Sequence, residues 1–240
     1  MSSRLSETWV YLAQTPLVWL TLTVVAYVAG EQLYRRLGRP AVANPVLTSV
    51  VLLGAVLVGT GTPYATYFEG AQFVHFLLGP AIVALAVPLH RELRRERSKA
   101  VPLTVALLAG STVAIVSAVA LGRLLGGSPE TVRSLAPKSV TAPVAMGIAE
   151  KLGGLPSFTA AMVLLTGLTG AVAGPAVLRA LRVKDPASAG FALGVASHGL
   201  GTARAFELGE TAGAFSGLGM GVNAVATSLL VPLLARWLLG

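Results

Sequence analysis

The sequence Ser197-His198-Gly199-Leu200-Gly201-Thr202-Ala203-Arg204 places several groups that can hold a carboxylate inside an otherwise apolar stretch. Hydroxyl and imidazole groups can orient a carboxylate and a neighbouring hydroxyl, and the planar guanidinium of Arg204 matches a carboxylate with two parallel hydrogen bonds. The charge of a histidine changes near physiological pH. We therefore predict that His198, together with Glu207, carries a coupling proton.

A second polar cluster, Pro137-Lys138-Ser139-Val140-Thr141, lies earlier in the chain. Its lysine could supply a second cation, and its hydroxyls resemble those of the first cluster in type. Asn223, in the last apolar stretch, is predicted to line the same cavity. The predicted substrate-binding set is therefore Lys138, Ser139, Thr141, Ser197, His198, Thr202, Arg204 and Asn223.

Some of these residues also have a structural interpretation. A serine or threonine in an apolar helix commonly bonds its own backbone, which is the alternative for Thr141 and Ser197. Arg204 could instead extend its charge to the membrane surface and pair with Glu207 or Glu210. Histidine at membrane depth is rare and usually functional, so His198 is the most informative of the set.

The composition is that of a membrane protein. Of the 240 residues, 54% are apolar and only 12% are charged, about half the charged share of an ordinary soluble domain. The net charge of +8 lies in short runs between apolar blocks, as expected of loop charges that set membrane topology. We therefore predict a multi-pass protein of the inner (plasma) membrane, with the lipid bilayer as its partner and no nucleic acid.

Six apolar blocks are long enough, or nearly so, to cross a bilayer as helices: Leu17–Leu33, Val46–Val58, Phe73–Leu89, Val101–Leu125, Phe158–Leu181 and Ala212–Leu238. A polar and aromatic turn is predicted between the second and third, from Gly61 to Glu69. Two further stretches, Ser128–Gly154 and Asp185–Gly209, are interrupted by prolines or glycines. We predict an N-terminal part, 1–127, with about four spans for scaffolding and dimerisation, and a carrier part, 128–240.

The carrier part contains an internal repeat, 128–184 and 185–240, at an offset of 57 residues. Ser128-Pro129 aligns with Asp185-Pro186, Pro175 with Pro232, and Thr141 with His198. A corresponding pair of interrupted apolar segments is the best sequence indicator of a transporter's binding site.

Charge distribution indicates how the repeat crosses the membrane. The basic residues Arg179, Arg182 and Lys184, like the charged run Arg91–Lys99, belong on the cytoplasmic side. Each interrupted segment must then enter and leave on one side as a re-entrant hairpin, and the two units are inverted. If both segments instead span the membrane, the three basic residues lie outside, against the positive-inside rule.

No pattern indicates an enzyme. The sequence has no nucleophile elbow, no His-Glu-x-x-His and no acidic metal cluster, and its three histidines lack the spacing of metal ligands. Cysteine is absent. We expect neither a cofactor nor a metal.

At its motifs the sequence resembles the LrgB family, also called CidB/LrgB or antiholin-like proteins. The resemblance runs from about Pro16 to the C-terminus. It rests most firmly on Ala196–Ala205 and Gly213–Gly217, with support from Asn44–Leu47, Tyr67–Ala71, Leu78–Leu89 and Pro137–Thr141. Two residues depart from the common pattern: Ala142 stands where a threonine is common, and Ala224 where a glycine is common.

The resemblance implies two functions. Bacterial members look like partners of small LrgA-type membrane proteins and regulators of murein hydrolase activity and lysis. Plastid members resemble this chain and translocate glycolate and glycerate, and some bacterial members are linked to pyruvate uptake. Our leading prediction is a secondary transporter of small monocarboxylates, namely 2-hydroxy or 2-oxo acids such as glycolate, glycerate or pyruvate. The alternative is an antiholin-like regulator of murein hydrolase activity and cell lysis that acts with an LrgA-type partner. A channel would differ from a carrier in saturation and counterflow. A homodimer is expected.

Overall fold

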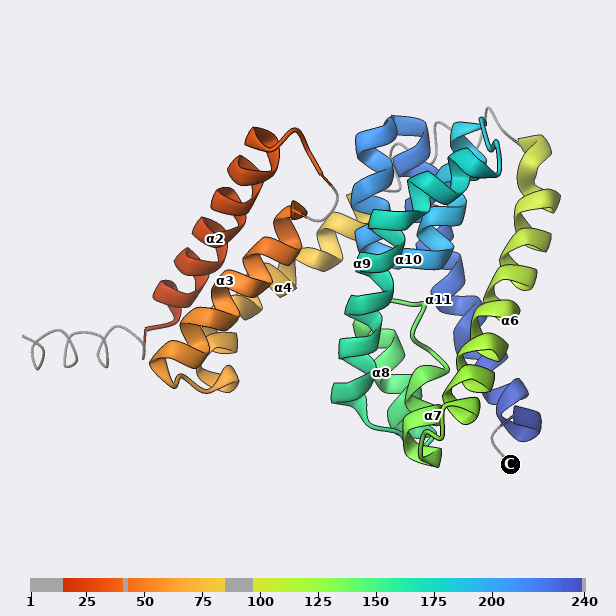
Figure 1. Ribbon diagram of the computed structural model, residues 1–240, viewed down its shortest axis with the longest axis horizontal. Coiled ribbons are helices and arrows are strands. Elements are labelled where there is room, and N and C mark those ends of the chain that lie inside the picture. The colour runs from red at the N-terminus through yellow and green to blue at the C-terminus, as the bar shows by residue number, and fades with distance from the viewer. Residues whose placement is uncertain (1–14, 41–42, 85–96, 239–240) are drawn as a thin grey trace, which may run out of the picture. The chain divides into compact units, whose positions relative to one another are not determined.

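The computed structural model describes residues 15–40, 43–84 and 97–238, and in these ranges the chain is helical and has no strand (Figure 1). The helices are α2 (Pro16–Arg36), α3 (Pro45–Thr60), α4 (Tyr64–Ala84), the 3-10 helix η2 (Arg97–Lys99), α6 (Ala100–Leu124), α7 (Pro129–Leu135), α8 (Ala142–Lys151), α9 (Pro156–Ala180), α10 (Pro186–Leu208) and α11 (Glu210–Leu238).

Several helices begin at the same local signal, a polar residue followed by proline. Asn44, Ser128 and Asp185 each accept a hydrogen bond from a backbone N–H of the first helical turn, and each precedes a proline at the first helical position. A side-chain acceptor satisfies a free N–H there, and proline lacks the N–H that would be left free. Ser128 and Asp185 are the residues aligned by the predicted repeat.

Four helices are long and apolar enough to cross a membrane, namely α2, α6, α9 and α11, and α3 is a shorter apolar helix. Their bounds agree within a few residues with the apolar blocks of the sequence. A helix of 25 residues such as α9 is about 37 Å long at 1.5 Å per residue. The chain is therefore a multi-pass membrane protein.

The predicted turn Gly61–Glu69 is wrong over most of its length, because α4 already begins at Tyr64. The aromatic residues of this stretch pack from within a helix: the Tyr67 and Trp19 rings meet edge to face at 5.9 Å, and the Thr23 hydroxyl bonds the Tyr67 hydroxyl. The last part of the third predicted span, 85–89, lies outside the described residues.

Contacts divide the chain into two compact units, 1–84 and 85–240. In the first, α2 packs against α3 and α4. In the second, α6 packs against α7, α10 and α11, and Ile115 and Val119 of α6 share a buried cluster with Val132 and Val231. Thus α6 joins the repeat region in packing, and the predicted functional division at residue 127 stays a prediction.

Residues 129–151 form a first hairpin, made of α7, an irregular tip (136–141) and α8. The Ser134 hydroxyl of α7 accepts a hydrogen bond from the Leu155 N–H, beyond the end of α8, and the Thr159 hydroxyl donates to the Ser134 carbonyl at 3.0 Å. The chain therefore turns back after α7, and α7 and α8 lie at the same end of the unit (Figure 1).

Residues 186–208 form a second hairpin, because α10 is broken at His198, whose φ of 40° and ψ of −127° are not helical. Leu193 and Ala205 share a buried cluster, although twelve residues of straight helix would separate them by about 18 Å. The two halves of α10 therefore lie side by side and form a hairpin. The first turn of α11 lies near the open end of this hairpin, where Ala212 is close to Gly190.

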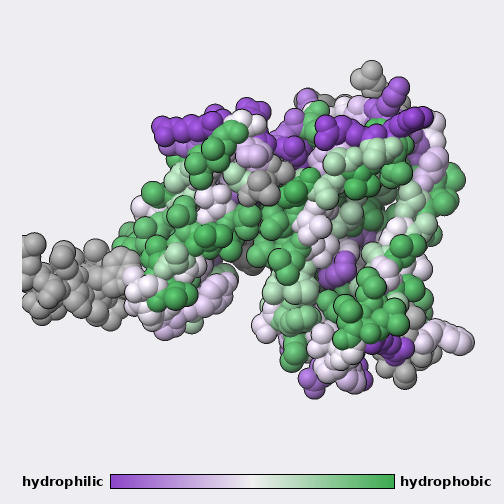
Figure 2. All heavy atoms as spheres, viewed as in Figure 1, coloured by the Kyte–Doolittle hydropathy of each residue, from purple (hydrophilic) through white to green (hydrophobic). Residues whose placement is uncertain are grey.

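The two hairpins lie along opposite halves of α9. Thr159, near the start of α9, contacts the first hairpin. In the later half of α9, Gly174 lies against Leu193 of the second hairpin, and Leu178 packs on the buried cluster that contains Leu193. Figure 2 shows hydrophobic residues over much of this unit's visible face and hydrophilic residues gathered toward the ends of its helices. The hairpin tips consequently reach the middle of an apolar bundle.

Candidate functional site

Asn223 of α11 connects the two hairpin tips. Its side-chain amide donates to the carbonyl of Ser139 at 3.0 Å and to that of Val195 at 2.9 Å. Its oxygen accepts hydrogen bonds from the hydroxyls of Ser111 in α6 and Thr227 in α11. The side chain is buried and its hydrogen-bonding capacity is used within the protein, so it braces the site in this conformation.

His198 forms the tip of the second hairpin in a strained conformation. A φ of 40° with a ψ of −127° is a region that favours glycine, and a non-glycine residue there costs on the order of 1–3 kcal/mol. The buried imidazole Nε2 lies 3.0 Å from the Val163 carbonyl of α9. The ring also packs on Gly167, where a Cβ would lie 2.5 Å from its Cε1. Such strain, held by its surroundings, is typical of functional positions.

Two hydroxyls flank this break. Thr202 donates to the His198 carbonyl at 2.9 Å and lies 3.1 Å from the Ser216 hydroxyl of α11. Ser197 is fully buried, and its hydroxyl has no hydrogen-bond partner among the described residues. It packs against Gly170 of α9. A buried polar group without a partner is costly, so Ser197 is a second sign of constraint at the tip.

A groove of about 520 Å³ adjoins the tips. The first hairpin contributes Lys138 and Ser139, and the remaining lining comes from Pro102, Leu103, Ala106, Gly110 and Ala114 of α6 and from Ser188, Phe191, Ala192, Val195 and Ala196 of α10. Small and apolar residues therefore form most of the wall, and Lys138 supplies a positive charge.

Lys138 is half-buried, and among the described residues no carboxylate lies within ion-pair distance of its ammonium. A desolvated cation is expensive without an anion or hydrogen-bond acceptors. The lysine is thus suited to an anionic ligand in the groove.

The remaining predicted site residues, Arg204, Glu207 and Thr141, are not among the residues that line the groove. Arg204 forms an ion pair with Glu207 on the same turn of α10, which was the alternative that the sequence left open. Six residues separate Arg204 from His198, about 9 Å along a helix, and Arg204 does not line the groove. Thr141 immediately precedes α8, makes no side-chain capping bond, and is half-buried. The roles of Arg204, Glu207 and Thr141 in binding stay predictions.

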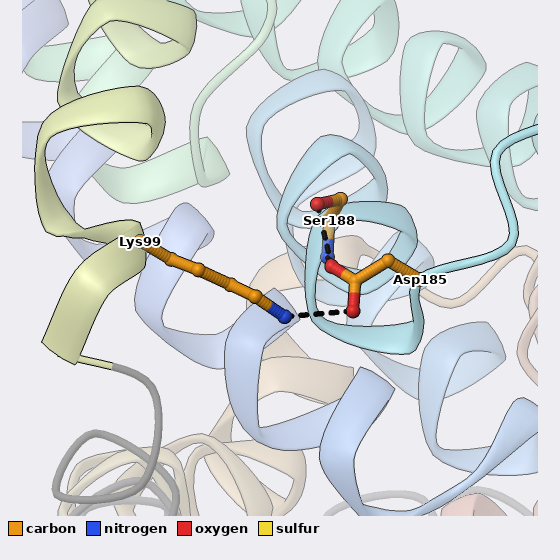
Figure 3. Close-up of polar contacts among 3 residues, drawn as sticks. All are labelled: Lys99, Asp185 and Ser188. Atoms are coloured by element: carbon orange, nitrogen blue, oxygen red, sulfur yellow. Dashed lines mark hydrogen bonds and ion pairs between the residues drawn. The ribbon is translucent and has the colours of Figure 1, made fainter.

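An ion pair ties together the two helices that wall the groove (Figure 3). Lys99, just before α6, donates to Asp185, just before α10, at 2.7 Å. The other Asp185 oxygen accepts from the N–H and the hydroxyl of Ser188, at 2.9 and 2.6 Å. Partial burial raises the pKa of Asp185, but the hydrogen bonds from Lys99 and Ser188 and the charge of Lys99 outweigh it and lower this pKa to about 2.

Sequence reasoning missed several of these partners. Ser111 and Gly170 lie in helices other than those of the residues they contact, and no spacing in the sequence indicates such pairs. The bond to Ser188 was recognisable, because an aspartate before a helix accepts a hydrogen bond from the N–H of the second or third helical residue, and Ser188 is three positions after Asp185.

Comparison with known proteins agrees with this architecture. The sequence matches the LrgB-like family over residues 23–237, which is most of the chain. The chain belongs to the LrgB family. No solved structure was found to match it.

Relatives of this LrgB-family protein cover nearly its whole length. It is 38% identical over 222 residues to the uncharacterized protein YxaC of Bacillus subtilis, a match that covers 92% of this chain and 96% of the relative. It is 31% identical over 215 residues to the holin-like protein CidB of Staphylococcus epidermidis, covering 90% and 93%. An uncharacterized protein of Haemophilus influenzae is 36% identical over 212 residues, covering 88% and 91%.

Proposed function

We propose that this LrgB-family protein is a secondary transporter of small monocarboxylates, namely 2-hydroxy or 2-oxo acids such as glycolate, glycerate, lactate or pyruvate. The observation that carries the proposal is Lys138, a half-buried ammonium without a carboxylate partner among the described residues, in a groove beside two helix breaks. Non-helical backbone at membrane depth is tolerated where protein buries it or it lines a cavity, and the Lys138 charge makes that cavity attractive to an anion.

The backbone near Lys138 adds further hydrogen-bond donors that could hold an anion. Helix α8 starts at Ala142, three residues after Ser139, and the residue before it, Thr141, makes no side-chain hydrogen bond to the N–H groups of the first turn. Free N–H groups and the positive end of a helix dipole favour negative charge. We place the substrate carboxylate between Lys138 and this helix start, with the Ser139 hydroxyl beside it.

Arg204 takes a different place in this proposal from the one the sequence suggested. Its guanidinium is engaged by Glu207, so Lys138 is the cation that we assign to the carboxylate in this conformation. His198 remains the proposed proton carrier, since its imidazole lies at the break, where its Nε2 lies 3.0 Å from the Val163 carbonyl, and the charge of a histidine changes near physiological pH.

The proposal includes an inverted repeat, with each unit a re-entrant hairpin followed by one spanning helix. It is supported by the matching helix starts at Ser128 and Asp185, by the tips joined through Asn223, and by hairpins that lie along opposite halves of α9. Inverted units around a midplane site permit alternating access by rocking one unit against the other. We further propose that the protein acts in the inner membrane as a homodimer.

The names of the relatives favour a second candidate function. CidB of Staphylococcus is described as holin-like, and an LrgB-family protein could regulate murein hydrolases through an LrgA-type partner without transporting anything. That function needs a contact surface for the partner and does not need a cation at Lys138. It therefore predicts that removing the Lys138 charge is silent.

Equilibrium binding of glycolate and pyruvate to the purified protein distinguishes the two candidates. The carrier predicts that Lys138→Gln weakens binding about tenfold or more, because a hydrogen bond to a charged group is lost. The matched control is Lys151→Gln, which removes an exposed lysine at the end of α8 and should bind normally. Equal affinities for Lys138→Gln and the native protein would contradict the carrier site.

A further inference from the structure

The ion pair Lys99–Asp185 lies at one end of the groove. Lys99 immediately precedes α6 and Asp185 immediately precedes α10, and the first groove residues on these helices are Pro102, Leu103 and Ser188. Figure 3 shows the Lys99 side chain reaching across from the start of α6 to the first turn of α10. The pair thus spans the space between the two walls.

Ser188 connects this pair with the groove itself. Ser188 lines the groove, and its hydroxyl donates to Asp185 Oδ2, while Lys99 donates to Asp185 Oδ1. Both oxygens of the carboxylate are therefore engaged, one by the wall of α10 and one by a cation from α6. Breaking the Lys99–Asp185 contact would therefore change the position or hydrogen bonding of Ser188 in the groove wall.

Lys138, which lines the groove, lies farther along it than the Lys99–Asp185 pair beside its end. Asn223 holds Ser139, the neighbour of Lys138, to Val195, and Val195 lies seven residues after Ser188, about 10 Å along α10. Lys99 and Lys138 therefore mark two successive positions along one groove. At the first position the cation is held by a carboxylate of the protein, the same chemical group as in the proposed substrate.

We propose that Lys99 is a mouth site for the substrate carboxylate, and that Asp185 occupies it as a tethered carboxylate until an anion displaces it. The Lys99–Asp185 pair closes this end of the groove, and an arriving anion opens it by exchanging places with Asp185. This inference rests on the proposed function for the identity of the anion. The pair is partly exposed, with side chains 28% and 40% accessible, so its net strength is small enough for such an exchange.

The test uses cysteine accessibility, which needs no transport. The sequence contains no cysteine, so Ala106→Cys gives a single reporter on the groove wall. Its rate of reaction is measured with a neutral methanethiosulfonate and with one that carries a sulfonate, in native, Asp185→Asn and Lys99→Gln backgrounds. Asparagine is as good a helix cap as aspartate, so Asp185→Asn removes the charge and keeps the start of α10.

We expect Asp185→Asn to accelerate both reagents about two- to fivefold, the range for breaking a partly exposed ion pair. Lys99→Gln should accelerate the neutral reagent and lower the ratio of anionic to neutral rates, because the mouth cation is gone. Leu125→Cys, at the opposite end of α6 and 85% exposed, should react equally in all backgrounds.

Unchanged rates at Ala106→Cys would overturn the gate, and an unchanged ratio in Lys99→Gln would overturn the mouth site. Parallel changes at Leu125→Cys would overturn the assignment to this end of the groove. The proposed function can fail separately: the expected labelling pattern without glycolate or pyruvate binding would leave the gate standing and reject those substrates.

Discussion

The Asn223 amide donates a hydrogen bond across 84 residues of sequence to the carbonyl of Ser139, 3.0 Å away. The same amide bonds Val195, close to the break of the second hairpin. One buried side chain therefore fixes the distance between the two hairpin tips. The geometry of the groove depends on this brace, since Ser139 and Val195 both line it.

Replacing Asn223 with alanine should destabilise the protein. The change leaves the Ser139 and Val195 carbonyls and the Ser111 hydroxyl without this partner, and an unsatisfied buried polar group costs about 1–3 kcal/mol. We expect a clearly lower midpoint of thermal unfolding in detergent. The control is Ser228→Ala on the same helix, whose exposed hydroxyl donates to the Ala224 carbonyl one turn earlier. Equal midpoints for the two variants would contradict the brace.

Gly170 should not tolerate a side chain. An added Cβ would lie 1.6 Å from the Ser197 hydroxyl oxygen, so Gly170→Ala must push the second hairpin away from α9, at a cost of about 1–3 kcal/mol. Gly147→Ala, in α8, is the matched control, because no atom lies within 4 Å of its added Cβ. Thermal unfolding checks both changes, and a Gly170→Ala protein as stable as Gly147→Ala would refute the contact.

The backbone at His198 gives an unusual order of stability. Glycine adopts a positive φ without strain, whereas alanine does not, so His198→Gly should unfold at a higher temperature than His198→Ala. Both variants lack the imidazole and its contact with Val163, and the comparison therefore isolates the backbone. In an ordinary helix the order is reversed, since glycine is about 1 kcal/mol worse than alanine; that reversed order would show that the helix is continuous.

Asp185 predicts an acid-sensitive part of the stability. Its pKa is lowered to about 2, against about 3.9 in an unfolded chain. Its contribution is therefore complete above about pH 4 and is lost as the pH falls from about 4 toward 2. The difference in unfolding midpoint between the native protein and Asp185→Asn should shrink over that window and be constant from pH 5 to 8. A difference that changes near neutrality would contradict this pairing.

The sequence was sufficient to predict local features of this fold. The apolar blocks around Ala100–Leu124 and Pro156–Ala180 gave helices with nearly the observed bounds, because length and hydropathy decide which segments can cross a bilayer. The interruption at His198 was also visible, from glycines close to a polar residue. These features depend on neighbours in the chain.

Contacts between distant segments could not be predicted in this way. The pairing of Asn223 with Ser139, and the fit of Ser197 against Gly170, depend on how helices pack. The start of α4 was misplaced because Tyr67 packs on Trp19, which outweighs the turn signals before it. For Arg204 the residue types allowed both a substrate and Glu207 as partner, and only the structure shows the pair with Glu207.

Counterflow uptake of labelled glycolate into proteoliposomes that contain only this protein tests the central claim most directly. We predict saturable uptake that is faster when glycolate is preloaded inside the liposomes. Lys151→Gln should not change it, whereas Lys138→Gln should raise the glycolate concentration for half-maximal uptake about tenfold or more. The same measurement is repeated with pyruvate and with an LrgA-type partner present. Uptake that appears only with the partner would make the protein one half of a two-component carrier. No uptake of either acid under both conditions, or uptake unaffected by Lys138→Gln, would contradict a carboxylate site in the groove.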